Sequence, residues 1–167
     1  AASDVYKRQT LDGEQIIYEQ FCYYMLNKPA GVVSATTDRE HKTVIDLLQE
    51  ANTQDVFPVG RLDIDTEGLL LLTNDGALAH ELLSPRKHVD KTYFVRIAGN
   101  LSDADVKQLE QGMDIGDEKL TLPAKVSCLE QFPEEQEQTV MIKLREGRYH
   151  QVKRMFAKVG HPVLYLQ

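Results

Sequence analysis

Gly60-Arg61-Leu62-Asp63-Ile64-Asp65-Thr66-Glu67-Gly68, followed by the apolar run at residues 69–72, is the stretch that decides the fold. Its three carboxylates and one arginine directly precede a continuous run of leucines. This pattern predicts a carboxylate held at the mouth of a buried sheet, where a catalytic acid would lie. The alternative is an Asp-rich turn that only caps the strand, because Asp tolerates turn geometry and hydrogen-bonds its own backbone. Spacing alone gives these two interpretations even weight.

A calcium loop is a further interpretation of the same stretch. Asp63, Asp65, Glu67 and Gly68 imitate the opening of an EF-hand loop. The twelfth position of that loop is Asn74, which cannot supply a bidentate carboxylate, and a leucine strand follows Gly68 where a helix is required. We therefore expect no metal at this turn.

The whole sequence is typical of one cytoplasmic domain. Its 167 residues are enough for a sizeable core. No apolar run approaches the roughly 20 residues that span a bilayer, and no basic-then-apolar leader opens the chain. Cys22 and Cys128 belong to no C-x-x-C pair, so we expect core thiols and neither zinc nor redox chemistry.

The charge is unevenly distributed along the chain. The formal net charge is -7, and acidic residues cluster at 102–118 and 130–137. If the basic clusters share a face, the protein carries a phosphate-binding surface despite its acidity. Solvated charge on a strand and a helix is the alternative, and it is favoured on this evidence alone. The basic clusters are Arg86, Lys87, Lys91 and Arg96, and Lys143, Arg145, Arg148, Lys153, Arg154 and Lys158.

Apolar periodicity and turn signals predict an α+β domain. Helices are expected at residues 44–50 after an N-cap at Thr43, and at 77–83, 102–111 and 151–159. Strands are expected at 21–26, 58–61, 69–73, 91–97, 120–129, 139–145 and 163–166. Strand-helix-strand units do not repeat regularly, which favours a central, mixed and largely antiparallel sheet flanked by helices.

Several short motifs in order along the chain resemble one enzyme family. They are the Gly60-Arg61-Leu62-Asp63 turn, the Asn27-Lys28-Pro29-Ala30-Gly31 segment, the Lys91-Thr92-Tyr93 strand, and the segment at 146–154. From about Tyr23 onward the chain resembles the pseudouridine synthases, in the RsuA-like branch that modifies ribosomal RNA. The resemblance implies the fold of that family and the isomerisation of uridine to pseudouridine, without cofactor or metal.

The same resemblance assigns roles to individual residues. It implies that Asp63 is the catalytic carboxylate, which attacks either the sugar or the base, and that Tyr93 stacks on the target base. Lys153 is expected to pair with Asp63 and to keep it ionised. Asp65 and Glu67 are expected to be structural.

The RNA contacts follow from the resemblance and from the basic clusters. Arg61 is similar to an arginine that helps to extrude the target nucleotide. Lys153 is preferred for the pairing with Asp63, and its neighbour Arg154 is expected to contact phosphate instead, since neighbours on a helix do not share a face. His150 and Gln151 are expected to be structural hydrogen-bonding residues. The complete set of expected RNA contacts is Arg61, Lys28, Arg86, Lys91, Arg145, Arg148, Arg154 and Lys158.

The expected organisation is a catalytic domain at 21–167 that is truncated at its C-terminus. Residues 1–20 are unassigned, with a remnant of an S4-type RNA-binding domain around 11–17 as the candidate. The expected partner is ribosomal RNA or the precursor of the small subunit, bound by a monomer.

The segments at 116–119 and 122–124 favour a 16S ribosomal RNA substrate over the 23S substrate of a sibling enzyme. A noncatalytic RNA-binding or ribosome-assembly module is the alternative from another class. A carboxylate glycosidase is less favoured, because the chain has no Trp and no series of sugar-binding aromatic residues.

Overall fold

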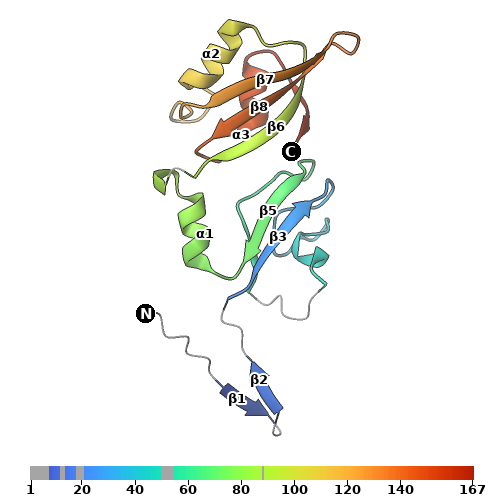
Figure 1. Cartoon of the computed structure of the whole chain (residues 1–167), viewed down its shortest axis with the longest axis vertical. Helices are drawn as coiled ribbons and strands as arrows, with labels where there is room; N and C mark the ends of the chain where they lie inside the picture. Colours follow the sequence, from blue (N-terminus) through green and yellow to red (C-terminus); the bar gives the residue numbers. More distant parts are fainter. Residues whose placement is uncertain (1–7, 12–13, 18–20, 50–54, 88) are drawn as a thin grey trace.

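The computed structural model describes residues 8–11, 14–17, 21–49, 55–87 and 89–167. They form an α+β fold, as expected, in which every paired strand is antiparallel (Figure 1). The strands are β1 (Arg8–Leu11), β2 (Glu14–Ile17), β3 (Tyr23–Lys28), β4 (Phe57–Val59), β5 (Gly68–Thr73), β6 (Lys91–Ala98), β7 (Lys125–Phe132), β8 (Glu137–Leu144) and β9 (Val163–Leu166). The α-helices are α1 (Gly76–Leu83), α2 (Asp103–Gln111) and α3 (Gln151–Lys158), and the 3-10 helices are η1 (Ile45–Leu47) and η2 (Pro85–Lys87).

The N-terminal lobe is built on a three-stranded sheet in the order β3-β5-β4, with α1 beside it (Figure 1). The leucines of β5 alternate between its two faces: Leu70 and Leu72 are buried, whereas Leu69 is exposed. The buried side chains pack against Val32, Val44 and Val56. The buried face of β5, the strand that follows the acidic turn, therefore anchors that turn to the core of this lobe.

The C-terminal lobe has a four-stranded sheet in the order β7-β8-β6-β9. Val95 and Ile97 of β6 are fully buried, as the alternation of apolar residues predicts. Leu109 of α2 and Phe156 of α3 belong to the same core cluster as these strands, so both helices cover one face of this sheet. The expected single central sheet is thus divided into two, each with its own core.

The ends of α2 follow directly from the sequence. The Ser102 hydroxyl accepts a hydrogen bond from the Asp105 amide, and the Asp105 carboxylate accepts one from the Ser102 amide, which completes a capping box. At the other end, Gly112 has a φ of +93°, and a Cβ there would lie 2.4 Å from the carbonyl oxygen of Thr121. Only glycine therefore allows this close approach of the backbone.

Several expected boundaries differ from the structure, among them those of the segments expected at 44–50, 77–83 and 120–129. Residues 45–47 form only the 3-10 helix η1, although the Thr43 hydroxyl does accept from the Asp46 amide at 3.3 Å, and Glu50 lies outside the described residues. α1 begins at Gly76, because the Asp75 side chain accepts from the Leu78 amide at 3.0 Å. β7 begins only at Lys125.

The late start of β7 has a local cause. The amides of Met113 and Leu122 are bound by the side chains of Thr121 and Glu146, so this segment is a loop held by side chains and not a strand.

Two further observations complete the fold. Cys128 is exposed, so the expectation of a core thiol was wrong for it. Among the described residues, no helix is both long and apolar enough to cross a bilayer.

Candidate active site

The acidic turn between β4 and β5 is held in place from both sides. The Ser34 hydroxyl donates to the carbonyl of Leu62 at 2.8 Å and accepts from its amide at 3.1 Å. The amide of Gly31 donates to the carbonyl of Ile64 at 2.7 Å. Asp63 lies between these two anchored residues, so its backbone is fixed before any substrate binds.

Lys28 lies beneath the turn and is fully buried. Its ammonium donates to the carbonyl oxygens of Thr66 at 2.7 Å, Pro29 at 2.8 Å and Ile64 at 3.3 Å. Burial lowers the pKa of Lys28, and the charges of nearby carboxylates oppose that shift. The expected RNA contact by Lys28 is incompatible with this geometry, because all three donors of its ammonium are directed at main-chain oxygens inside the protein.

The start of α3 brings two side chains onto the Asp63 carboxylate. The ammonium of Lys153 lies 3.2 Å from Asp63 Oδ2, and Nδ1 of His150 lies 2.7 Å from the same oxygen. Lys153 also donates to Asp65 Oδ1 at 2.6 Å. The expected pairing of Lys153 with Asp63 is therefore present, and Asp65 shares the same cation.

The charges of this cluster stabilise one another. The hydrogen bond from Lys153 lowers the pKa of Asp65. Partial burial lowers the pKa of Lys153, but its hydrogen bonds with Asp65 and Asp63 outweigh that effect and the net shift is upward. The ammonium therefore stays charged at neutral pH beside a carboxylate that is only 23% exposed.

Tyr93 lies on β6 and packs against the core cluster of the C-terminal lobe. Burial raises the pKa of Tyr93, and the negative charge of Asp63 raises it further. The phenol is thus neutral at neutral pH and lies within the electrostatic reach of the carboxylate. Asp63, Tyr93 and Lys153 come from three separate parts of the chain: Lys153 lies 3.2 Å from Asp63, and Tyr93 lies near enough for the charge of Asp63 to raise its pKa.

Glu67 links the lobes beside this cluster. Its carboxylate accepts from the Tyr165 hydroxyl at 2.6 Å, and its amide donates to the carbonyl of Leu166 at 3.1 Å. The expected structural role of Glu67 fits these two contacts. Asp65, in contrast, lies in the charged cluster itself.

His150 is the site residue that sequence reasoning missed. It was expected to be structural, but its ring contacts Asp63 directly. His150 directly precedes α3, which carries Lys153, but its left-handed backbone conformation has no signature in the sequence, so no local pattern indicated this contact.

Two of the expected RNA-binding arginines are engaged within the protein. Arg148 donates to Glu146, and to the carbonyls of Lys119 at 2.7 Å and Leu120 at 2.8 Å. Arg154 donates to Asp117 Oδ1 at 2.8 Å. Both guanidinium groups therefore hold the loop before β7 against α3, which uses most of their donors.

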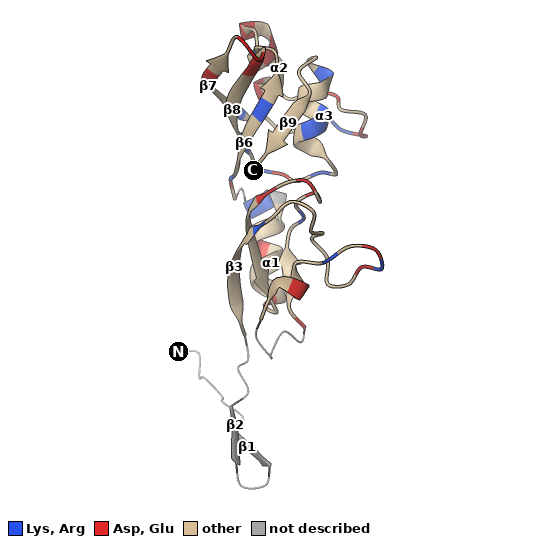
Figure 2. Cartoon of the chain, turned by 90° about the vertical axis from the view of Figure 1, so that its right-hand side faces the viewer, with Lys and Arg blue, Asp and Glu red and all other residues tan. Residues whose placement is uncertain are grey.

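The other expected RNA contacts are more accessible. Arg145 is exposed and pairs with Asp90 at 3.0 Å. Lys91 is half-buried. Arg61, Arg86 and Lys158 are exposed and have no ion-pair partner among the described residues. Figure 2 shows that basic residues lie on α3 and that acidic residues gather over α2 and β7.

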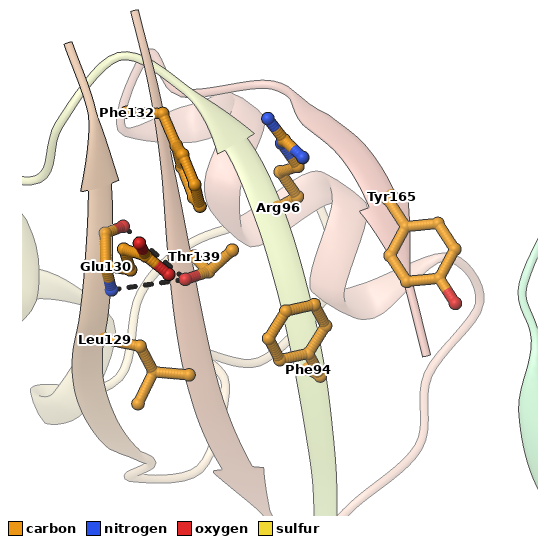
Figure 3. A pocket seen from close by; sticks show the side chains of 7 residues that line it. All are labelled: Phe94, Arg96, Leu129, Glu130, Phe132, Thr139 and Tyr165. Atoms are coloured by element: carbon orange, nitrogen blue, oxygen red, sulfur yellow. Dashed lines mark hydrogen bonds between the residues drawn. The ribbon is translucent and has the colours of Figure 1, made fainter.

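An open groove on the outer face of the four-stranded sheet is separate from this cluster. Phe94, Phe132, Leu129 and Tyr165 line it, and the guanidinium of Arg96 lies 4.6 Å from the ring centre of Phe132 (Figure 3). None of Asp63, Tyr93 and Lys153 lines this groove. Nor do the described residues include a cluster of three or more His, Cys, Asp or Glu side chains that could hold a metal ion.

Comparison with known proteins gives consistent matches. A family model described as RNA pseudouridylate synthase matches residues 22–158. The uncharacterized RNA pseudouridine synthase YtzG of Bacillus subtilis is 47% identical over 159 residues, which cover 95% of this chain and 66% of that protein. Ribosomal small subunit pseudouridine synthase A of Yersinia pestis is 46% identical over 145 residues, 86% of this chain and 59% of that protein.

A solved structure described as a crystal structure of pseudouridylate synthase superposes with a TM-score of 0.77 at 35% identity. The match covers 91% of this chain and 64% of that chain. The present chain thus spans less than two thirds of the length of these relatives.

Proposed function

Because this chain belongs to the RNA pseudouridylate synthase family, we propose that it isomerises a specific uridine of small-subunit ribosomal RNA to pseudouridine. The observation that carries the proposal is the Asp63 carboxylate, which Lys153 and His150 hold beside Tyr93 at the junction of the two lobes. The small-subunit substrate is favoured by the relative from Yersinia pestis and by the segments at 116–119 and 122–124.

The chemistry is an isomerisation within one nucleotide. The bond between the sugar carbon C1′ and the base nitrogen N1 breaks, the uracil rotates, and a bond forms between C1′ and C5. The proton on C5 leaves and N1 gains a proton, so nothing is oxidised or reduced. The protein must supply a nucleophile, hold the detached base and manage that proton.

Asp63 is the proposed nucleophile, and it attacks either the sugar or the base. An ionised carboxylate reacts best when it is shielded from water and oriented. The partial burial of Asp63 gives the shielding, and the contacts with Lys153 and His150 give the orientation. Tyr93 would stack on the target base, with its neutral hydroxyl close to the place where the proton of C5 is lost.

Exposed cations would hold the RNA. Arg61 precedes Asp63 by two positions and is exposed, so its guanidinium can occupy the space that an extruded nucleotide leaves or bind its phosphate. Arg86, Lys91 and Lys158 would contact the RNA backbone at a greater distance from the target nucleotide. Arg145, Arg148 and Arg154 have weaker claims, because each is already paired with a carboxylate.

The remaining proposals concern organisation. Residues 21–167 would form the catalytic region, and the strands β1 and β2 would belong to an adjoining RNA-binding domain of the S4 type. A monomer acting on ribosomal RNA in the cytoplasm, without a cofactor, fits this function.

The test compares two carboxylates that share one lysine. Small-subunit and large-subunit ribosomal RNA are incubated with the wild type, Asp63→Asn and Asp65→Asn, and pseudouridine is mapped. We expect product at one small-subunit uridine, its loss in Asp63→Asn and its retention in Asp65→Asn. Product only in large-subunit RNA would identify the sibling activity, and RNA binding without product would indicate the noncatalytic module. Full activity in Asp63→Asn would refute the assigned nucleophile.

A further inference from the structure

The Asp63 carboxylate is held through only one of its two oxygens. Nδ1 of His150 lies 2.7 Å from Oδ2, and the ammonium of Lys153 lies 3.2 Å from that same atom. No described residue donates a hydrogen bond to Oδ1. Two donors on one oxygen fix the plane of the carboxylate and leave the other oxygen free.

The backbone of His150 is shaped for this contact. His150 has φ 47° and ψ 35°, the left-handed conformation that residues other than glycine rarely adopt, and it stands directly before α3. Its side chain does not cap the helix. Such conformations persist where the surroundings demand them, and they cluster at functional sites.

Tyr149 restrains the ring from one side. The two ring centres are 3.9 Å apart, and the planes are almost perpendicular at 80°. The hydrogen bond from Arg154 Nε to the carbonyl of Tyr149, at 2.8 Å, fixes the backbone just before His150. The imidazole is therefore directed at Asp63 by its own backbone and by its neighbour.

We infer that His150 is a positioning residue for Asp63: its Nδ1–H donates to Oδ2 and turns Oδ1 towards the substrate. An ionised carboxylate only accepts hydrogen bonds, so the proton of the contact is on Nδ1. The inference rests on the proposed function, because the oxygen that it leaves free is the proposed nucleophile. Lys153 forms an ion pair with the same carboxylate, whereas His150 orients it.

Three variants distinguish a residue that positions Asp63 from one that only stabilises the fold. His150→Asn keeps a residue that tolerates the left-handed conformation, and its amide places an N–H donor close to where the imidazole has Nδ1. His150→Gly relieves the backbone strain but has no donor, and His150→Ala lacks both advantages. If the role of His150 were purely structural, kcat would change only as far as stability does, and His150→Gly would then be as active as His150→Asn.

The experiment measures kcat and KM on ribosomal RNA together with the free energy of unfolding. We expect kcat to fall on the order of 10- to 100-fold in the glycine and alanine variants, with KM little changed, since a misplaced reacting group loses rate more than binding. His150→Asn should recover most of kcat. The inference would be overturned if His150→Asn and His150→Gly had equal kcat values, or if His150→Gly kept the kcat of the wild type.

A second readout does not depend on activity. The ¹⁵N resonance of His150 Nδ1 should show a protonated, hydrogen-bonded nitrogen in the wild type and should shift in Asp63→Asn but not in the matched Asp65→Asn. If the wild type makes no pseudouridine while this signature is present, the proposed function fails and the contact stands. If Asp63→Asn leaves the signature unchanged, the positioning role fails whatever the activity.

Discussion

The buried ammonium of Lys28 donates a hydrogen bond of 2.7 Å to the main-chain carbonyl of Thr66, two residues before the strand that anchors the acidic turn. Together with its bonds to Pro29 and Ile64, this contact makes a lysine the internal support of the turn that carries Asp63. The position of the candidate nucleophile thus depends on a lysine that is buried inside the protein.

Lys28→Met should destabilise the protein on the order of 3 kcal/mol, because buried carbonyl oxygens would lose their donor and the methionine cannot replace it. Chemical denaturation measures the change in the free energy of unfolding. Lys42→Met is the matched control, since Lys42 is exposed and its change should stay within about 0.5 kcal/mol. Similar losses in both variants would argue against a supporting role for Lys28.

Arg148→Ala should act on the loop before β7. Arg148 binds Glu146 and the carbonyls of Lys119 and Leu120, so its loss should reduce stability by about 1 to 3 kcal/mol and speed hydrogen exchange of the Leu122 amide, which Glu146 binds. Hydrogen exchange and denaturation report these effects. Unchanged exchange at Leu122 would show that the loop does not need the arginine.

Lys158→Ala should weaken RNA binding without loss of stability. Lys158 is exposed on α3, so removing one phosphate contact should reduce the slope of log binding constant against log salt concentration by about 1. Lys107→Ala is the control, because Lys107 is also exposed but lies on α2, which carries several acidic residues. An equal slope in the wild type and Lys158→Ala would remove this lysine from the RNA surface.

Asp117 should give the protein an acid-sensitive component of stability. The hydrogen bond from Arg154, with a further one from Arg148, lowers its pKa below the ordinary 3.8. A carboxylate with a lowered folded-state pKa stabilises fully above its unfolded-state pKa, and the gain is lost as the pH falls through the folded-state value.

The free energy of unfolding should therefore fall more steeply below about pH 4 in the wild type than in Asp117→Asn. Glu118→Gln is the control, since Glu118 is an exposed neighbour that has no ion pair among the described residues. Parallel curves for the wild type and Asp117→Asn would contradict the assignment.

Much of the fold could be predicted because its signals are local. The alternation in β6 places Val95 and Ile97 in the core, and Ser102 with Asp105 marks the start of α2. The family was recognisable because its motifs occur in order along the chain, and the match over residues 22–158 confirms it. The catalytic roles of Asp63, Tyr93 and Lys153 stay predictions.

The contacts that could not be predicted from the sequence involve partners that are distant along the chain. A lysine is expected at the surface, and only the carbonyls of Ile64 and Thr66 explain why Lys28 is buried. The RNA contacts expected of Arg148 and Arg154 stay predictions, but the pairing of both with Asp117 depends on the fold and could not be predicted from the sequence. Likewise, the left-handed backbone of His150, which directs its ring at Asp63, has no signature in the sequence.

The pKa of Tyr93 offers a direct measure of the electrostatic effect of Asp63 at the site. Burial is the larger cause of its raised pKa, and the charge of Asp63 is the second. Asp63→Asn removes that charge but leaves the ring packed in the C-terminal lobe, so the pKa of Tyr93 should fall and yet remain above the ordinary 10.0. A titration of ¹³C-labelled tyrosine rings by NMR measures the shift. Tyr165 is the internal control, because its pKa is raised first by a hydrogen bond to Glu67 and should not move. A constant pKa of Tyr93 would mean that its ring does not sense the Asp63 carboxylate, and it would then have no claim to a place beside the target base.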